Sequence, residues 1–180
     1  LIPCTGKIID SSEIKNMISA SMDGWLTTGR FNTDFQNKLA KYLNVKKLIT
    51  VNSGSSANLI AFSSLTSHLH KNKAIKPGDE VITTPFTFFA TASVIMMAGA
   101  KPVFADVEED GFTLDPIQVT QSITGKTKAI QPVHLYGELA NVPTLIEIAE
   151  KNNLILIEDS AQAHNAQSWG GRAGSFGETG

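Results

Sequence analysis

Two polar side chains stand directly after a strongly apolar run near the end of the sequence. Residues 154–157 are four consecutive aliphatic residues, and Asp159 and Gln162 follow them. A short apolar run with turn-forming residues after it is typical of a strand buried on both faces of a parallel sheet. Ligands of open α/β sheets bind beyond the carboxyl ends of the strands. The pattern therefore predicts a carboxylate and an amide at the floor of a ligand crevice, with a simple capping role for Asp159 as the alternative.

A turn of small residues offers a site for an anion. Asn52–Asn58 reads Asn-Ser-Gly-Ser-Ser-Ala-Asn and lies between an expected strand and an expected helix. Free N–H groups at a helix start, the hydroxyls of Ser55 and Ser56, and the missing side chain of Gly54 suit a phosphate. An ordinary serine cap is the alternative. The turn is neither a P-loop nor a dinucleotide-binding glycine motif, because the lysine of the first and the three glycines of the second are absent.

Three phenylalanines follow the expected strand 81–84. They are Phe86, Phe88 and Phe89, and one of them could lie flat against an aromatic ligand. Core packing is the alternative for two of the three. The acid at 159, the serine turn and a stacking ring together describe a ligand with a phosphate at one end and a basic heteroaromatic ring at the other. Pyridoxal phosphate fits this description.

Helices and short apolar strands alternate along the chain, and this predicts an α/β domain with a mostly parallel sheet flanked by helices. Expected helices begin at Ser11 or Ser12, at Thr33, in the serine turn (ending near Leu69), at Thr87 (ending at Ala98), at Asp115–Pro116, and at Asn141 or Thr144 (ending near Lys151). Expected strands cover residues 48–51, 81–84, 102–105, 129–133 and 154–157.

Composition narrows the class of protein. The 180 residues are 42% hydrophobic and 18% charged, with a net charge of −2, which is typical of a globular domain and gives no basic excess for nucleic acid. The single cysteine, Cys4, permits neither an internal disulfide nor a cysteine metal site, and no histidine pair has metal-ligand spacing. The apolar runs are too short to span a bilayer and no signal peptide is visible, so a cytoplasmic protein without membrane or metal is expected. Five glycines in residues 168–180 suggest the first part of a longer protein.

Seven segments resemble the sugar aminotransferases of the DegT/DnrJ/EryC1/StrS family, which are fold-type-I pyridoxal-phosphate enzymes. They are Trp25–Gly29, Asn52–Ala57, Pro77–Ile82, Thr87–Thr91, Pro132–Gly137, Glu158–Ala163 and Gly174–Gly177. The segments cover nearly the whole chain in family order. The resemblance implies that residues 1–180 form the N-terminal part of such an enzyme, mainly its large cofactor-binding domain. Residues 1–30 would lie near the active site, and the small C-terminal domain would be absent.

The resemblance also implies roles for individual residues. Gly54, Ser55 and Ser56 would hold the phosphate, and Phe88 would stack on the pyridine ring. Asp159 would bond the ring nitrogen and Gln162 the ring hydroxyl. A carboxylate that keeps the nitrogen protonated makes the cofactor an electron sink, so Asp159 is the expected catalytic residue.

Substrate contacts are expected from Trp25, Thr27, Gly29 and His134, the last because it ends a strand that faces the crevice. The Schiff-base lysine of the family follows the Gly174–Gly177 segment and would lie beyond Gly180.

The implied reaction moves an amino group from an amino acid, glutamate by preference, to a nucleotide-linked keto-sugar for cell-surface polysaccharide such as lipopolysaccharide, or for deoxyaminosugars. The cofactor would alternate between pyridoxal and pyridoxamine phosphate, and the enzyme would be a homodimer. Two alternatives stay open. Residues 23–32 and 51–59 resemble pyridoxamine-phosphate-dependent 3-dehydrases, which carry histidine in place of the lysine, whereas residues 84–91 and 132–137 resemble the aminotransferases. A cofactor-binding protein without catalysis is the other alternative.

Overall fold

The computed structural model describes residue 6 and residues 8–180, so Cys4 lies outside the described residues. The chain divides into two compact units, residues 1–50 and residues 51–180. The first unit contains helices α1 (Ser11–Met22) and α2 (Arg30–Leu43), and the second contains the sheet with its helices. Each unit is described by itself below.

Both helices of the N-terminal unit begin earlier than the sequence predicts, α1 by one or two residues and α2 by about one turn. The cap of α1 is Asp10, not a serine: its Oδ1 accepts the Ser12 N–H at 2.7 Å, and Glu13 accepts the Asp10 N–H at 2.8 Å. This reciprocal pair is a capping box. The cap of α2 is Gly29, not Thr33, because the Thr33 N–H already bonds the Gly29 carbonyl at 3.1 Å.

The expected strand at residues 48–51 is absent. Among the described residues, these four belong to no strand and take part in no strand pairing. An apolar run becomes a strand only where a neighbouring strand completes its main-chain hydrogen bonds, and the sequence alone does not show that neighbour.

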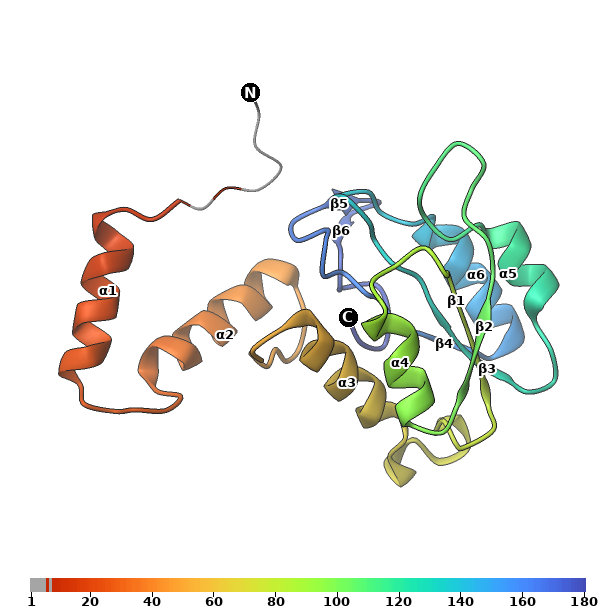
Figure 1. The fold of residues 1–180 in the computed structure, drawn as a ribbon, viewed down its shortest axis with the longest axis horizontal. Coiled ribbons are helices and arrows are strands. Elements are labelled where there is room, and N and C mark those ends of the chain that lie inside the picture. The colour runs from red at the N-terminus through yellow and green to blue at the C-terminus, as the bar shows by residue number, and fades with distance from the viewer. Residues whose placement is uncertain (1–5, 7) are drawn as a thin grey trace. The chain divides into compact units, whose positions relative to one another are not determined.

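A four-stranded parallel sheet forms the centre of the second unit (Figure 1). Its strands are β1 (Glu80–Thr83), β2 (Lys101–Phe104), β3 (Thr127–Gln131) and β4 (Ile155–Leu156), in the spatial order β2-β1-β3-β4. Every neighbouring pair in this sheet is parallel. The chain adds β2 on one side of β1 and then β3 on the other, so the direction of winding reverses between β1 and β3. The predicted α/β class is confirmed, and a reversal of this kind marks the edge where such sheets bind ligands.

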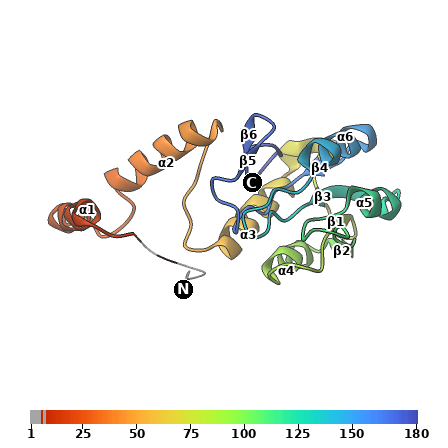
Figure 2. The ribbon, with the colours of Figure 1, turned by 90° about the horizontal axis from the view of Figure 1, so that it is seen from above.

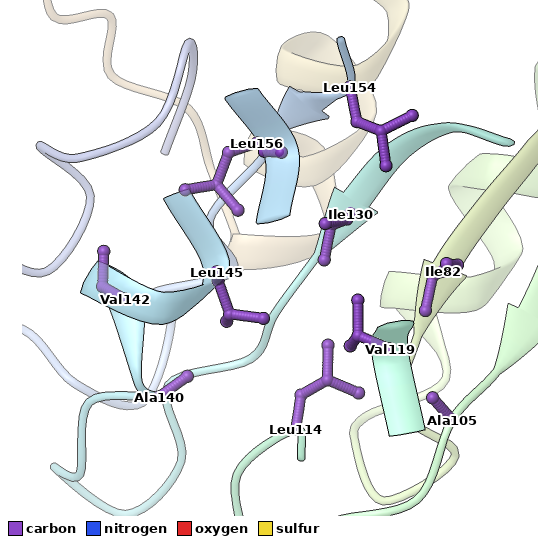
Figure 3. Packing of buried hydrophobic residues seen from close by; sticks show 11 residues of the cluster. Ile82, Ala105, Leu114, Val119, Ile130, Ala140, Val142, Leu145, Leu154 and Leu156 are labelled. Carbon is purple, nitrogen blue, oxygen red and sulfur yellow. The ribbon is translucent and has the colours of Figure 1, made fainter. Parts of the chain in front are cut away.

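Helices cover both faces of this sheet (Figure 2). The helices are α3 (Gly54–Leu65), α4 (Ala90–Met97), α5 (Pro116–Ser122) and α6 (Val142–Asn152). Alternate strand residues enter different cores, as the two-residue period of a strand requires. Ile82, Ile130 and Leu156 pack with α5 and α6 (Figure 3), whereas Val81, Ala129 and Ile155 pack with α3 and α4. The expectation that 154–157 is buried on both faces is therefore confirmed.

Several boundaries differ from the prediction by a few residues. Helix α3 ends at Leu65 rather than near Leu69, and a 3₁₀ segment, η1 (His68–Lys73), follows it. Helix α4 begins at Ala90 rather than Thr87. The predicted caps Asp115 and Asn141 are confirmed, since each side chain accepts an N–H from the first turn of its helix.

The end of the chain forms a hairpin of β5 (Gln167–Ser168) and β6 (Gly171–Arg172). Trp169 and Gly170 both have positive φ, 48° and 78°, which is the pattern of the tight turns that connect hairpin strands. None of the helices in the described part of the chain is long and apolar enough to cross a membrane.

Candidate active site

Asp159 lies at the carboxyl edge of the sheet, as the sequence predicts. Its N–H donates to the Pro132 carbonyl at 3.0 Å, and its own carbonyl accepts the His134 N–H at 2.9 Å. These bonds extend the pairing of β3 and β4 beyond their last residues. The residue is 6% exposed, so its carboxylate stands at the boundary between the core and the edge.

The two oxygens of the Asp159 carboxylate have different surroundings. Oδ2 accepts a hydrogen bond from Asn58 Nδ2 at 2.8 Å and another from Thr91 Oγ1 at 2.7 Å. From the residues that the structure describes, Oδ1 accepts one hydrogen bond, the Ala161 N–H at 3.3 Å. Asp159 thus caps the following segment through Oδ1, as the alternative predicted. This cap accounts for one of the three hydrogen bonds described here, and the two bonds to Oδ2 are separate from it. Oδ1 keeps the capacity to accept a shorter, charge-assisted bond from a cationic ligand atom.

Polar residues that the sequence analysis did not select support this carboxylate from behind. The Oδ1 of Asn58 accepts Gln131 Nε2 at 3.1 Å, and this fixes which end of the Asn58 amide faces Asp159. The hydroxyl of Thr91 is 2.8 Å from that of Thr87. Asn58, Thr91 and Gln131 are all buried. Their only sequence signal is a polar residue near the start of α3, another in the first turn of α4 and a third at the last position of β3.

The serine turn begins helix α3 and is partly a cap. Ser53 is the N-cap and accepts the Ser56 N–H at 3.2 Å, while Ser56 Oγ donates to Asn52 Oδ1 at 2.7 Å. Gly54 and Ser55 occupy the first two helical positions, where main-chain N–H groups have no partner within a helix. Both residues are exposed. The cap and the anion site are compatible, because the cap uses a different N–H group from those of Gly54 and Ser55.

Gly54 lets this turn approach the segment after Asp159. A Cβ atom placed on Gly54 would be 3.2 Å from the Cβ of Ala161, which is tighter than ordinary packing. The contact with Ala161 and the bond from Asn58 to Asp159 together hold the start of α3 against the 159–162 segment. The candidate phosphate site and the candidate ring-nitrogen partner are therefore brought together.

The aromatic residues before α4 are exposed, so the core-packing alternative is wrong. Phe86, Phe88 and Phe89 are 44%, 57% and 70% exposed. The rings of Phe88 and Phe89 lie 4.4 Å apart, centroid to centroid, and are tilted by 44°. The Phe88 carbonyl accepts the N–H of Thr91, the residue that bonds Asp159. Phe88 thus lies about one helical turn before Thr91, which bonds Asp159 directly. The exposed ring of Phe88 is accessible to a ligand.

Gln162 and His134 have opposite environments. The side chain of Gln162 is exposed, while its carbonyl accepts the Gly137 N–H at 3.0 Å. The side chain of His134 is completely buried: Nε2 is 2.9 Å from Glu158 Oε2, and Nδ1 accepts the Ala140 N–H at 3.2 Å. The expectation that His134 lines a substrate site is therefore wrong, because both ring nitrogens are occupied inside the protein.

The other candidate substrate residues belong to the N-terminal unit. Trp25, Thr27 and Gly29 line a recess of about 470 Å³ within that unit. The Trp25 Nε1–H donates to the Thr28 carbonyl at 2.9 Å. Asp23 and Arg30 also line the recess and form an ion pair at 2.7 Å. Their hydrogen bond lowers the pKa of Asp23 and raises that of Arg30. A substrate role for these residues stays a prediction.

No group of three histidine, cysteine, aspartate or glutamate side chains that could hold a metal ion occurs in residue 6 and residues 8–180.

The fold is an α/β domain with a parallel sheet, and its candidate site lies at the carboxyl ends of the strands. The chain belongs to the DegT/DnrJ/EryC1/StrS aminotransferase family, whose model matches residues 7–180, and this confirms the resemblance seen in the sequence.

Among curated relatives, the chain is 42% identical over 180 residues to the lipopolysaccharide biosynthesis protein RfbH of Salmonella typhimurium, covering 100% of this chain and 41% of that protein. It is 35% identical to the GDP-perosamine synthase of Caulobacter vibrioides, covering 94% of this chain and 44% of the synthase. The chain thus spans less than half the length of these relatives.

Solved structures give the same result for the fold. The structure of GDP-4-keto-6-deoxymannose-3-dehydratase with a trapped PLP-glutamate geminal diamine superposes with a TM-score of 0.90 at 27% identity. The match covers 97% of this chain and 45% of the dehydratase. The predicted fold-type-I architecture is therefore confirmed over the part of the fold that this chain contains.

Proposed function

We propose that the protein containing this chain is a pyridoxal-phosphate-dependent aminotransferase that acts on a nucleotide-linked keto-sugar. The observation that carries the proposal is the Asp159 carboxylate. One of its oxygens is held by Asn58 and Thr91, and the other faces the carboxyl edge with spare acceptor capacity. The GDP-perosamine synthase among the relatives supports a nucleotide-sugar substrate.

The residues present fit the cofactor. The N–H groups of Gly54 and Ser55 at the start of α3, with the Ser55 hydroxyl, would hold the phosphate. Phe88 would stack on the ring and Gln162 would reach its hydroxyl. Asp159 would accept the ring N–H and stabilise its positive charge. When bound, the cofactor supplies an electron sink that the protein's own side chains cannot provide.

The remaining features of the proposal come from the family. Glutamate is the proposed amino donor, and the trapped PLP-glutamate adduct in the related dehydratase supports binding of that amino acid. The name of RfbH supports a role in lipopolysaccharide biosynthesis. We propose a cytoplasmic homodimer in which residues 1–180 supply the N-terminal part of the large domain and a lysine after the Gly174–Gly177 segment binds the cofactor covalently.

A sugar 3-dehydratase is the second candidate, because specific observations favour it. The solved dehydratase superposes over 97% of this chain, and a curated relative at 33% identity is dTDP-4-dehydro-2,6-dideoxy-D-glucose 3-dehydratase of Saccharopolyspora spinosa. The described cofactor residues suit both reactions, since both need Asp159 on the ring nitrogen. The residue after the Gly174–Gly177 segment separates them: lysine for the aminotransferase, histidine for the dehydratase.

The test is Asp159→Asn in the full-length protein, with Asp106→Asn as the matched control. Asp106 also follows a strand at the carboxyl edge, but it is exposed and bonds its own neighbour, the Val107 N–H. We expect Asp159→Asn to retain part of the bound cofactor and to lose nearly all turnover with an amino acid and a nucleotide keto-sugar, while Asp106→Asn resembles the wild type. Near-normal rates in Asp159→Asn would refute the role of Asp159. Loss of the sugar 3-hydroxyl without amination would identify the dehydratase.

A further inference from the structure

Next to Asp159 lies a second buried carboxylate that the proposed chemistry does not use. The side chain of Glu158 is completely buried. A carboxylate is seldom buried unless hydrogen bonds replace its lost water. Glu158 and Asp159 are consecutive in an extended segment, so their side chains leave the chain on opposite sides. Asp159 bonds residues of α3 and α4, whereas Glu158 bonds a different part of the chain.

Three of the four hydrogen bonds that the Glu158 carboxylate accepts from described residues come from one loop. Oε1 accepts the N–H groups of Phe176 and Gly177, each at 2.7 Å. Oε2 accepts the Gly174 N–H at 2.9 Å. The carboxylate thus accepts hydrogen bonds from three main-chain N–H groups of the segment Gly174–Gly177, here called the glycine loop.

The fourth hydrogen bond comes from His134, and the contacts of its ring indicate the tautomer. Nδ1 of His134 accepts the Ala140 N–H, so the ring hydrogen lies on Nε2 and is donated to Glu158 Oε2 at 2.9 Å. Within the described residues, the Glu158 carboxylate therefore accepts hydrogen bonds from four N–H groups. The main-chain N–H of the same His134 bonds the carbonyl of Asp159. One histidine thus supports both acidic residues.

The glycine loop is packed too tightly to shift without breaking these bonds. A Cβ atom on Gly177 would be 2.5 Å from the Leu156 carbonyl oxygen. Immediately after the loop, the Glu178 N–H bonds the Leu156 carbonyl and the Thr179 carbonyl accepts the Glu158 N–H, both at 2.9 Å. Thr179 also pairs with Ile157 in a parallel bridge. The chain therefore leaves the loop alongside the strand that carries Asp159.

We propose that Glu158, oriented by His134, is a positioning residue that holds the glycine loop so that the chain after it runs beside the Asp159 strand. This inference rests on the proposed function, in which the residue that binds the cofactor covalently follows this loop. Loss of the hydrogen bonds between Glu158 and the glycine loop would leave the hydrogen bonds of Asp159 intact. It would misplace the side chain that binds the cofactor covalently. The expected effect is on turnover and covalent attachment more than on cofactor binding.

The experiment uses the full-length protein and a matched pair of histidine variants. Glutamine places its amide N–H where Nε2–H of histidine was, whereas asparagine reaches only the Nδ1 position. His134→Gln therefore keeps a donor for Glu158, and His134→Asn loses it. Glu158→Gln removes the charge and turns an NH₂ group toward N–H donors. The two histidine variants keep the Glu158 carboxylate and its three hydrogen bonds from the glycine loop. They therefore test the inference even if Glu158→Gln does not fold.

We expect hydrogen exchange of the Gly174, Phe176 and Gly177 amides in cofactor-free protein to become at least about tenfold faster in Glu158→Gln. His134→Asn should show a smaller increase and His134→Gln should resemble the wild type. In the loaded enzyme, kcat should fall at least about tenfold in Glu158→Gln with KM changed far less, and His134→Gln should retain more of kcat than His134→Asn.

Two results would overturn the inference. One is unchanged exchange of the loop amides in Glu158→Gln, and the other is faster exchange with unaltered kcat and covalent attachment. Equal behaviour of the two histidine variants would exclude the role of His134. Failure of the proposed function is distinguishable, because it shows as retained turnover in Asp159→Asn, whatever the exchange of the glycine loop.

Discussion

Thr91 is expected to be as necessary to the cofactor site as a residue that touches the cofactor, because it holds Asp159. Its side chain is completely buried, and its hydroxyl is 2.7 Å from Asp159 Oδ2 and 2.8 Å from the Thr87 hydroxyl. Its single hydrogen goes to the carboxylate, so Thr87 donates to Thr91. Thr91→Val keeps the shape of the side chain and removes both bonds.

The magnitude follows from the kind of hydrogen bond that is lost. A hydrogen bond to a charged group contributes about 1.5–3 kcal/mol, and about 1.4 kcal/mol corresponds to a factor of ten. Asp159 keeps its bond from Asn58, and the half-buried Thr87 can turn its hydroxyl to water. We therefore expect a loss near the lower end of that range, which is roughly a tenfold to thirtyfold weaker binding of pyridoxal phosphate by the full-length protein.

The assay is the dissociation constant of the cofactor, measured by fluorescence titration of the cofactor-free protein, together with the urea midpoint of unfolding. Thr91→Ser is the control, because it keeps the hydroxyl and loses only a buried methyl group worth about 0.8 kcal/mol. The reasoning predicts that serine preserves cofactor affinity and that valine does not. If valine and serine gave the same dissociation constant, the hydroxyl of Thr91 would have no part in orienting Asp159.

Two further predictions concern the glycine loop and the start of α1. Gly177→Ala should destabilise the protein by about 1–3 kcal/mol, because the added Cβ would meet the Leu156 carbonyl oxygen at 2.5 Å, whereas Gly125→Ala, with nothing within 4 Å, should leave the urea midpoint unchanged. Equal midpoints for the two variants would contradict the close packing. Hydrogen bonds from the main chain and then the side chain of Ser12 lower the pKa of Asp10 below its ordinary value of 3.8. The contribution of this cap is therefore complete above that ordinary value and is lost as the pH falls through the lowered pKa. NMR shifts of the first turn of α1 should follow this transition in the wild type and stay constant in Asp10→Asn, which caps without titrating, so a transition in both would refute the assignment.

Local patterns were enough to predict strands β1–β4 and helices α3–α6 of the second unit, apart from some of their boundaries, and to place Asp159 at the end of a strand. The apolar run 154–157 can satisfy its main chain and bury every side chain only inside a parallel sheet, and the structure places it there. Proline and asparagine signals located the starts of α5 and α6, because a cap is formed by residues that are close in sequence. The end of such a strand is the place where this fold binds ligands, so Asp159 and Gln162 followed from the strand alone.

Where local rules offered competing answers, the sequence prediction failed. Three consecutive residues, Asp10, Ser11 and Ser12, could each cap α1, and Asp10 is the one that forms the reciprocal pair with Glu13. Residues 48–51 have the composition of a strand, but the described chain pairs nothing with them. The aromatic residues after β1 were expected in part as core, yet the loop that carries them turns their rings outward.

The residues that support the site came only from the tertiary structure. Asn58 lies 101 residues before Asp159, and Thr91 lies 68 residues before it. No periodicity relates such positions, since they meet because α3 and α4 pack on the same face of the sheet. His134 was misassigned for the same reason: the end of β3 leads toward the ligand edge, but its ring turns inward to a buried carboxylate 24 residues later. Sequence by itself determined which side chains end the strands. The packing of the helices and the glycine loop decided which of them lie exposed at the carboxyl edge and which are buried behind it.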